Sequence, residues 1–582
     1  MSARQIAAEV QSGRKSALVV AQETIARIVA YDQTQPQTWI SRFPDSAVLD
    51  AAGAVDARIA AGEQLALAGV PFAVKDNIDV AGLATTAACP EFAYHPQRSA
   101  VVVDKLLAAG AVCLGKTNLD QFATGLNGTR SPYGAPRCVF NLAYVSGGSS
   151  SGSAVAVGAG LVSFALGTDT AGSGRVPAAF NGLVGLKPSK GRWSTTGLLP
   201  ACRSLDCITV FAGSAADCGL VDEVVAGFDE EDAYSCHLAD RPVGKRIGVP
   251  LARNRPWFSD HEAEWLYDRA LERLEALGYT LLPVDIAPLL DAARLLYDGP
   301  WVAERTAAIE GFLKANKSAI DPTVRSIIEA GLGQSAIDAF RGQYRLAEFA
   351  RIAEKMWQEV DALAVPTSPT IYRVREMLAN PVALNSHFGT YTNFVNLLDM
   401  AAIAVPAGFR LNGTGFGISF FAPAGSDRAL LEMAEAWGNP YTQPQFDLEG
   451  RMERVRLAVV GAHLKDMPLH WQLSSRNAQL IAVTETAPTY RLYAMANSTP
   501  PKPALVHDAA GAAIAVEVYE LDVAEFGSFV AEVPPPLAIG TITLSDGSQV
   551  KSFVAEPRAT EGARDITALR SWRTFIAEGT VT

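Results

Sequence analysis

The chain has 582 residues, of which 49% are hydrophobic and 19% charged, and its formal net charge is −12 at pH 7. This length predicts two or three domains with a large core, and the acidic balance argues against a nucleic-acid partner, which would require a basic face. No apolar run is long enough for a membrane helix and the first 30 residues lack a signal-peptide layout, so we expect a cytoplasmic protein without membrane contact.

The cysteines also favour a cytoplasmic protein, and the histidines argue against a metal site. Seven cysteines, an odd number without a CxxC pair, are typical of reduced thiols in the cytoplasm. The seven histidines are scattered along the chain, which argues against a zinc site.

The N-terminal part begins with helical spacing of apolar residues. We expect one amphipathic helix over residues 2–31 and a second helix over 46–61. A short β-like run at 70–74 then ends on Lys75 and Asp76. A Lys–Asp pair is usually a solvated surface pair. Here the preceding residues are apolar, so Lys75 can instead be a buried amine, and burial lowers the pKa of a lysine enough for base chemistry.

Strands and helices then alternate along the chain, which predicts an α/β domain with a parallel or mixed sheet. Expected helices cover residues 99–108, 258–280 and 322–360, and expected buried strands cover residues 111–114, 361–366 and 401–405. The sequence GTGFGISFFAP predicts a further strand, and a closing helix follows with Ser426 at its N-cap.

The amino-acid composition of the chain changes near residue 439. A polar, Pro-containing stretch predicts a linker at 441–455, which ends a first domain at 1–440. Residues 456–582 are rich in β-branched runs and Pro turns, and the SDG turn predicts a hairpin. We therefore expect a small, β-rich α+β domain at the C-terminus.

Residues 144–175 contain two Gly/Ser clusters, 147–153 and 170–174, around an apolar run at 154–166. A flexible linker does not enclose an apolar run, so the pattern predicts two tight turns joined by one buried element. Such turns present serine hydroxyls beside uncovered backbone amides, which suits a hydroxyl nucleophile next to an oxyanion hole. A Gly/Ser turn that serves close packing alone remains the alternative.

Two familiar motifs are present only in part. Gly148 to Gly152 match G-x-S-x-G, but the nucleophile elbow also needs an Asp and a His downstream. His237, His261 and His387 follow, and none stands in a Gly-rich or strand-end loop. A phosphate-binding loop would need Gly-Lys-Ser/Thr after the glycines, which is absent here.

Three motifs together give a better account. VKDNIDVAG, GGSSSGS and GTDTAGSGRVPAA resemble, in the expected order, the motifs of the amidase signature family, over about residues 20–440. The resemblance implies a mixed sheet surrounded by helices. It also implies that Ser173 is the nucleophile, Ser149 a bridging serine after a cis peptide bond, and Lys75 the base. Ser149 would relay a proton from Ser173 to neutral Lys75.

The same resemblance assigns the loop around the nucleophile. Asp169 and Arg175 would brace it as an ion pair, and its backbone amides would bind the oxyanion. The expected oxyanion donors are Thr170, Ala171, Gly172 and Ser173. Ala171 and Gly174 replace residues that are Gly and Ile in many members, which leaves the three catalytic positions intact.

Within the family, DAARLLYDGPWVAERTAAIEG, LDCITVFAGSAAD and YTNFVNLLDMAAIAVPAGF resemble allophanate hydrolases. The substrate this implies is allophanate, urea-1-carboxylate, whose carboxylate Tyr297 and Arg305 would hold. An arginine on a helix surface is the alternative for Arg305. The last domain resembles the C-terminal domain of the same enzymes, which implies that it breaks down N-carboxycarbamate, with His463 as its working residue. A structural histidine is the alternative there.

The resemblance implies hydrolysis of allophanate to ammonia and carbon dioxide without a metal or organic cofactor. It further implies a homodimer and a urea carboxylase as the metabolic supplier of the substrate. Another small-amide amidase of the family, or the amidase subunit of a tRNA amidotransferase, remains open. So does a non-catalytic scaffold, against which the intact Lys75, Ser149 and Ser173 argue.

Overall fold

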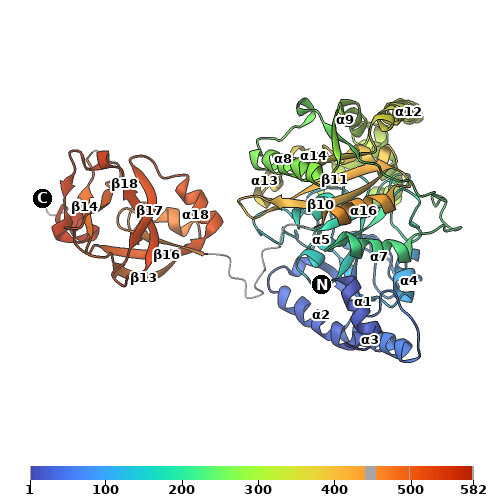
Figure 1. Ribbon diagram of the computed structural model, residues 1–582, viewed down its shortest axis with the longest axis horizontal. Helices are drawn as coiled ribbons and strands as arrows, with labels where there is room; N and C mark the ends of the chain where they lie inside the picture. Colours follow the sequence, from blue (N-terminus) through green and yellow to red (C-terminus); the bar gives the residue numbers. More distant parts are fainter. Residues whose placement is uncertain (1, 439–453, 497, 580–582) are drawn as a thin grey trace. The chain divides into compact units, whose positions relative to one another are not determined.

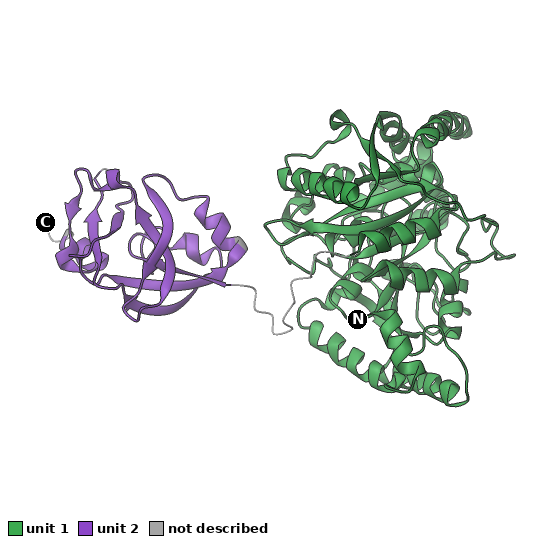
Figure 2. Cartoon of the chain, in the orientation of Figure 1, with its two compact units in different colours: residues 1–443 green, residues 444–582 purple. Residues whose placement is uncertain are grey.

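The computed structural model describes residues 2–438, 454–496 and 498–579. The chain divides into two compact units, Met1–Gln443 and Pro444–Thr582 (Figure 2). The predicted linker at 441–455 lies outside the described residues, except for its last two residues, which begin strand β12 (Arg454–Val459).

The first unit is built on one mixed sheet of 11 strands in the order β1-β3-β2-β4-β6-β5-β10-β11-β9-β7-β8 (Figure 1). Its strands are β1 Trp39–Arg42, β2 Pro71–Lys75, β3 Val112–Thr117, β4 Phe164–Asp169, β5 Val184–Lys187, β6 Cys207–Ala212, β7 Arg246–Pro250, β8 Thr280–Val284, β9 Ala362–Pro366, β10 Met400–Phe409 and β11 Gly415–Pro423. Strand β2 runs parallel to β3 and β4, whereas β4 and β6 are antiparallel. The predicted α/β class with a mixed sheet is confirmed.

Helices surround this sheet (Figure 1). They are α1 Ala3–Gln11, α2 Ala17–Tyr31, α3 Asp45–Ala60, α4 Val101–Ala108, α5 Ser151–Gly158, α6 Val176–Phe180, α7 Ala215–Val225, α8 His261–Ala276, α9 Ala287–Arg294, α10 Trp301–Ala315, α11 Pro322–Ala330, α12 Ala336–Glu359, α13 Val374–Ala379, α14 Ala383–Phe388, α15 Asn393–Leu397 and α16 Asp427–Trp437. Within the described residues, no helix is long and apolar enough to cross a membrane.

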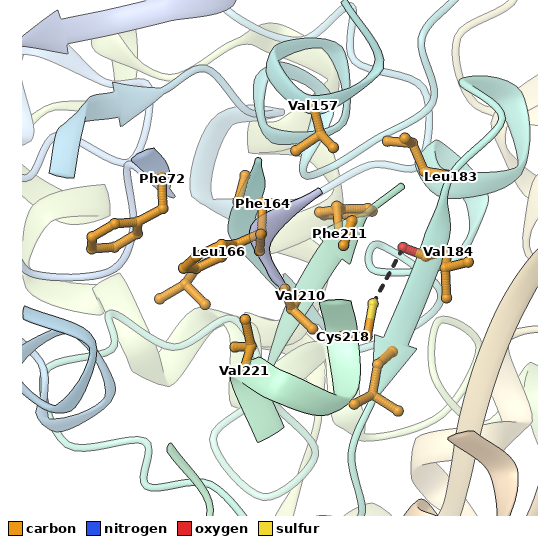
Figure 3. Packing of buried hydrophobic residues seen from close by; sticks show 14 of the residues in the cluster. Phe72, Val157, Phe164, Leu166, Leu183, Val184, Val210, Phe211, Cys218 and Val221 are labelled. Atoms are coloured by element: carbon orange, nitrogen blue, oxygen red, sulfur yellow. Dashed lines mark hydrogen bonds between the residues drawn. The ribbon is translucent and has the colours of Figure 1, made fainter. Parts of the chain in front are cut away.

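The central strands are buried along their whole length, and for this reason the sequence shows continuous apolar runs there. Every residue of β2, β4 and β6 is buried, as expected for strands covered on both faces. Phe72 of β2 stacks on Phe164 of β4 with 5.2 Å between ring centroids, and Phe211 of β6 lies in the same cluster (Figure 3). This packing fixes the relative position of the strands that carry the site.

Two predicted long helices are each broken in the structure. The expected helix at 2–31 is α1 and α2, separated by a turn in which Gly13 has φ +72° and Ser16 caps α2 by accepting a hydrogen bond from the Val19 amide. The expected helix at 322–360 is α11 and α12, and Ser335 begins α12 with a capping box. Helical periodicity continues across such breaks, whereas the Gly and Ser signals mark them.

The apolar run at 154–166 does not form the single element expected of it, so this prediction was wrong. It contains the end of α5, a turn at Gly160 with φ +70°, and the start of β4. The helix at the end of the unit was predicted correctly. Ser426 stands at its N-cap position, but its side chain makes no capping hydrogen bond.

The second unit contains a five-stranded sheet, β13-β16-β12-β18-β17, and a three-stranded sheet, β15-β14-β19. Besides β12, its elements are α17 Trp471–Ser474, β13 Gln479–Glu485, β14 Tyr490–Ala494, β15 Pro503–His507, β16 Ala515–Asp522, α18 Val523–Val530, β17 Leu537–Thr543, β18 Gln549–Ala555, β19 Arg564–Asp565 and α19 Trp572–Gly579. The predicted hairpin is present, because β17 and β18 pair antiparallel across the turn at Gly547. A hydrophobic cluster of its own includes Leu457, Val518 and Trp572.

Candidate active site

The site lies where two parallel strands end. Strands β2 and β4 pair in register, with Val74 opposite Leu166, so their carboxyl ends meet at the same edge of the sheet. Lys75 is the last residue of β2, and Thr168 and Asp169 end β4. The two Gly/Ser turns, which precede α5 and follow β4, meet at this edge.

The structure brings the three predicted catalytic residues into one chain of hydrogen bonds. The Lys75 Nζ lies 2.7 Å from Ser149 Oγ, and the Ser149 Oγ lies 3.0 Å from Ser173 Oγ. All three side chains are buried, and the Gly148–Ser149 peptide bond is cis. This order of groups allows a proton to move from Ser173 through Ser149 to Lys75.

A fourth residue, Thr168, fixes the lysine and was not predicted from the sequence. Its Oγ1 accepts a hydrogen bond from Lys75 Nζ over 2.6 Å. Thr168 precedes Asp169 within the nucleophile motif, so its position at the end of β4 was the available signal.

The environment of Lys75 favours the neutral form of its amine. Burial lowers the pKa of the Lys75 amine to about 7, although Asp120, Asp206 and Asp169 counteract this, and the Arg305 charge lowers the pKa further. A substantial fraction of the amine is therefore neutral at neutral pH and able to accept a proton.

We expect kcat/KM to fall on the acid side of about pH 7, because protonated Lys75 has no lone pair to offer. A pH profile of amide cleavage measures this limb. The Asp206 carboxylate raises the pKa of Lys75, so Asp206→Asn should move the limb to lower pH. A profile that stays flat through neutral pH, or a limb that Asp206→Asn leaves in place, would contradict the assignment of Lys75 as the base.

The loop that carries Ser173 is held by a buried ion pair. The Asp169 carboxylate accepts hydrogen bonds from Arg175 Nε and Nη2, each over 2.9 Å. It also accepts from the backbone amides of Gly172 (2.8 Å) and Gly174 (3.0 Å). Because the Gly172 amide already donates to Asp169, it is not available to an oxyanion, and this removes Gly172 from the expected set of oxyanion donors.

The other three expected amides have no acceptor within the described protein. Among the described residues, the backbone amides of Thr170, Ala171 and Ser173 donate no hydrogen bond to the protein. The loop is fixed around them, since Thr392 Oγ1 donates to the Ala171 carbonyl over 2.6 Å and the Thr170 hydroxyl donates to Asp206. Three fixed amides without an acceptor form a suitable pocket for a developing negative charge.

Asp120 supports the bridging serine from the other side. Its amide donates to the Ser149 carbonyl over 3.0 Å, and its buried carboxylate accepts from the amides of Asn127, Gly128 and Arg130. The Ser149 backbone is thereby tied to a loop that follows β3. This contact was not predicted, because Asp120 lies in an irregular segment of the sequence where no local pattern marks it.

Arg305 is a buried cation in helix α10, so the alternative of a helix-surface arginine was wrong. Its side chain stacks over the half-buried Tyr297 at 5.4 Å, and its Nη1 donates to Thr124 Oγ1 over 3.3 Å. The Arg305 Nε has no hydrogen-bond partner. In the part of the chain that the structure describes, no carboxylate lies within ion-pair distance of Arg305. A buried charge in this state is expensive without an anion, so the position suits a negatively charged ligand.

The nucleophile-elbow alternative finds no support in the geometry. Ser150, the central serine of that pattern, donates to the Thr168 carbonyl over 3.1 Å and so has a structural role. His387 binds the Tyr372 hydroxyl (2.6 Å). Among the described residues, no histidine forms a hydrogen bond with Ser149, Ser150 or Ser173.

His463 belongs to the second unit and follows β12. Its Nε2 lies 2.7 Å from Gln472 Oε1, and its ring stacks on Phe553 with 4.9 Å between centroids. Burial lowers the pKa of its imidazole. His463 lines a cavity of about 260 Å³. A histidine in a cavity wall can reach a ligand, which a fully packed core histidine could not.

A buried Ser–Ser–Lys chain at the end of a mixed sheet is a site suited to a serine amidase with lysine in place of histidine. Residues 20–431 match the amidase family model, and the chain belongs to this family. Residues 455–577 match the model of the allophanate hydrolase C-terminal domain.

Similar proteins cover both units. A urea amidolyase of Saccharomyces cerevisiae is 44% identical over 548 residues, which are 88% of this chain and 30% of that protein. The chain thus spans about 30% of the length of the urea amidolyases it matches. The structure of a Kluyveromyces lactis allophanate hydrolase has a TM-score of 0.71 and 42% identity, and the match covers 97% of this chain and 98% of that one.

A third relative matches the first unit. A subunit of the glutamyl-tRNA(Gln) amidotransferase of Deinococcus deserti is 36% identical over 463 residues, which are 71% of this chain and 94% of that protein. The comparison with the allophanate hydrolase structure confirms the predicted fold class for the whole chain.

Proposed function

We propose that this chain hydrolyses allophanate to ammonia and carbon dioxide. The observation that carries the proposal is Arg305, a buried cation that has no carboxylate within ion-pair distance among the described residues and whose charge acts on the Lys75 amine. An amide substrate that also bears a carboxylate would fit this site, because its amide can meet Ser173 while its carboxylate pairs with Arg305. The similarity to allophanate hydrolase and urea amidolyases supports the same substrate.

In the first step, Ser173 Oγ attacks the terminal amide carbon of allophanate. The Ser173 proton passes to Ser149, whose own proton passes to neutral Lys75, so the hydrogen bonds of the resting chain reverse direction. The amides of Thr170, Ala171 and Ser173 stabilise the oxyanion. Lys75 then returns the proton through Ser149 to the leaving nitrogen, and ammonia departs.

The acyl group now on Ser173 still bears the carboxylate, which stays on Arg305 beside Tyr297. Water attacks the ester carbon with Lys75 again accepting the proton, and the products are N-carboxycarbamate and free Ser173. The dianion then loses carbon dioxide and yields the second ammonia. We propose that the second unit performs this last step and that His463 supplies the proton.

A fragment of residues 1–440 should still consume allophanate, because the triad and Arg305 all lie in the first unit, which has its own core. We expect the fragment to release one ammonia promptly and the second only as fast as N-carboxycarbamate decays in solution. Decay consumes a proton, so the lag should lengthen as the pH rises. Following ammonia against substrate loss at mildly alkaline pH measures it.

The full chain should show no such lag, and His463→Ala in the full chain should reproduce the lag of the fragment. His507→Ala is the matched control, since the His507 side chain is exposed in the same unit. Prompt release of two ammonia molecules by the fragment would leave the second unit without a part in the reaction.

The cellular setting is also a proposal. A urea carboxylase would supply allophanate in the cytoplasm, and the chain would act as a homodimer. Light scattering on the purified chain measures the oligomeric state, and a coupled assay with urea, bicarbonate, ATP and a urea carboxylase tests the supply.

Ammonia release from a panel of amides tests the function. We expect turnover of allophanate and slower turnover of malonamate, which keeps the same spacing between its amide carbon and its carboxylate, and none of urea, which has no carboxylate. Glutamine decides the alternative suggested by the amidotransferase relative. Faster release from glutamine than from allophanate would contradict the proposal.

A further inference from the structure

The cavity beside His463 contains a second cation, Lys502, which has no ion-pair partner among the described residues. Lys502 lines this cavity of about 260 Å³ together with His463, Glu532 and the aromatic rings of Phe529 and Phe553. The Lys502 charge acts directly on the His463 imidazole, so the ammonium group and the ring are near one another. In the described part of the second unit, no carboxylate lies within ion-pair distance of Lys502.

The carboxylate in the cavity wall, Glu532, already forms an ion pair with Arg476. Glu532 accepts from Arg476 Nη2 over 2.6 Å and from Gln472 Nε2 over 3.3 Å. Its charge is therefore neutralised by a partner other than Lys502. An anion that enters the cavity meets an unpaired ammonium and is not repelled by a free carboxylate.

The hydrogen bonds of Gln472 fix how His463 faces the cavity. Because the Gln472 Nε2 donates to Glu532, its Oε1 is the atom that accepts from His463 Nε2 over 2.7 Å. The neutral imidazole thus carries its proton on Nε2 and keeps a lone pair on Nδ1. Stacking on Phe553 and the edge of Phe529 holds the ring in this orientation.

Most of the remaining wall is apolar. It includes Val460, Ala462, Leu469, Val533 and Leu537 together with three prolines, and Thr499 and Gln472 add polar side chains. A carboxylate that faces such a wall loses hydration, whereas neutral carbon dioxide does not need it. A small molecule with two carboxylates can place one on Lys502 and the other against this wall.

We propose that this cavity binds a small dicarboxylate dianion, with Lys502 paired to the carboxylate that is retained and the apolar wall against the one that is lost. The identity of the dianion as N-carboxycarbamate rests on the proposed function. The C–N bond breaks and its electron pair stays on nitrogen, which takes a proton that solvent has first delivered to the Nδ1 lone pair of His463. Carbon dioxide and carbamate are the products.

Malonate is a stable probe, because a methylene replaces the NH of N-carboxycarbamate. The test is calorimetric titration of malonate into the full chain carrying Arg305→Gln, which disables the other carboxylate site. We expect one bound malonate, with affinity reduced at least tenfold by adding Lys502→Gln. Lys502→Arg, which keeps the charge, should restore binding.

Lys551→Gln is the matched control, since this exposed lysine of β18 contacts only Thr541 among the hydrogen bonds described for it. No malonate binding in the Arg305→Gln chain, or equal binding with and without Lys502, would overturn the proposal. Circular dichroism of each variant checks that the second unit keeps its fold.

A second readout separates this proposal from the proposed function. In an otherwise unchanged chain, Lys502→Gln should release the first ammonia from allophanate at the normal rate and the second after a lag. If the unchanged chain releases no ammonia from allophanate, the proposed function fails, and the malonate titration still decides the role of Lys502. A Lys502→Gln chain without a lag would overturn that role.

Discussion

Ser173→Ala and Lys75→Ala should each lower kcat/KM for amide cleavage by at least about a thousandfold, because members of one proton relay fail together. In the proposed mechanism Ser173 supplies the attacking oxygen, and Lys75 is the proton acceptor at the end of the 2.7 Å and 3.0 Å hydrogen bonds that link the three residues. The double variant should be hardly worse than either single variant. Steady-state ammonia release measures all three.

The matched controls are three histidines of the first unit. His237→Ala, His261→Ala and His387→Ala should retain amide cleavage, since no described hydrogen bond links a histidine to the triad. A histidine variant that keeps its fold and loses cleavage would refute a lysine-based relay. The kcat/KM of Ser149→Ala should lie between those of the histidine variants and those of Ser173→Ala and Lys75→Ala, because water can replace the missing hydroxyl between Ser173 and Lys75.

Arg305→Ala should remove about 2–5 kcal/mol of transition-state stabilisation for allophanate, the usual range when one partner of a buried charge pair is removed. That corresponds to a loss of roughly 30- to 4,000-fold in kcat/KM. The same variant should scarcely affect propionamide, a neutral amide that makes no use of the guanidinium. Comparing kcat/KM on the two substrates isolates the recognition of the carboxylate.

Arg294→Ala serves as the control variant, because among the described residues this exposed arginine on α9 forms an ion pair only with Asp291. It should leave both substrates unchanged. Equal losses on allophanate and propionamide in Arg305→Ala would mean that Arg305 supports the fold and does not select the anion.

The sequence indicated the elements that carry the site because those signals are local. The apolar run before Lys75 predicted a buried strand, and β2 ends on that lysine. The two Gly/Ser clusters predicted turns. The first turn leads into α5, whose first three residues belong to the cluster, and the second turn follows β4. Motif order then allowed the catalytic roles to be assigned by resemblance, and the resulting trio lies within hydrogen-bond distance.

The groups that hold these residues in place could not be predicted in the same way. Thr392 and Asp206 reach the nucleophile loop from segments distant in the sequence, and Asp120 reaches Ser149 from an irregular segment. Such contacts depend on tertiary packing, which leaves no periodic signal. The Gly172 amide was likewise assigned wrongly from the sequence, because only the structure shows that it donates its hydrogen bond to Asp169.

One measurement tests most directly whether Ser173 is where allophanate is cut. A fluorophosphonate probe, followed by peptide mass spectrometry, identifies the reactive serine and its labelling rate. We predict labelling at Ser173 that allophanate slows in the unchanged chain and does not slow in Arg305→Ala. Labelling at a different serine, or a labelling rate at Ser173 that allophanate leaves unchanged while the chain consumes it, would contradict the account.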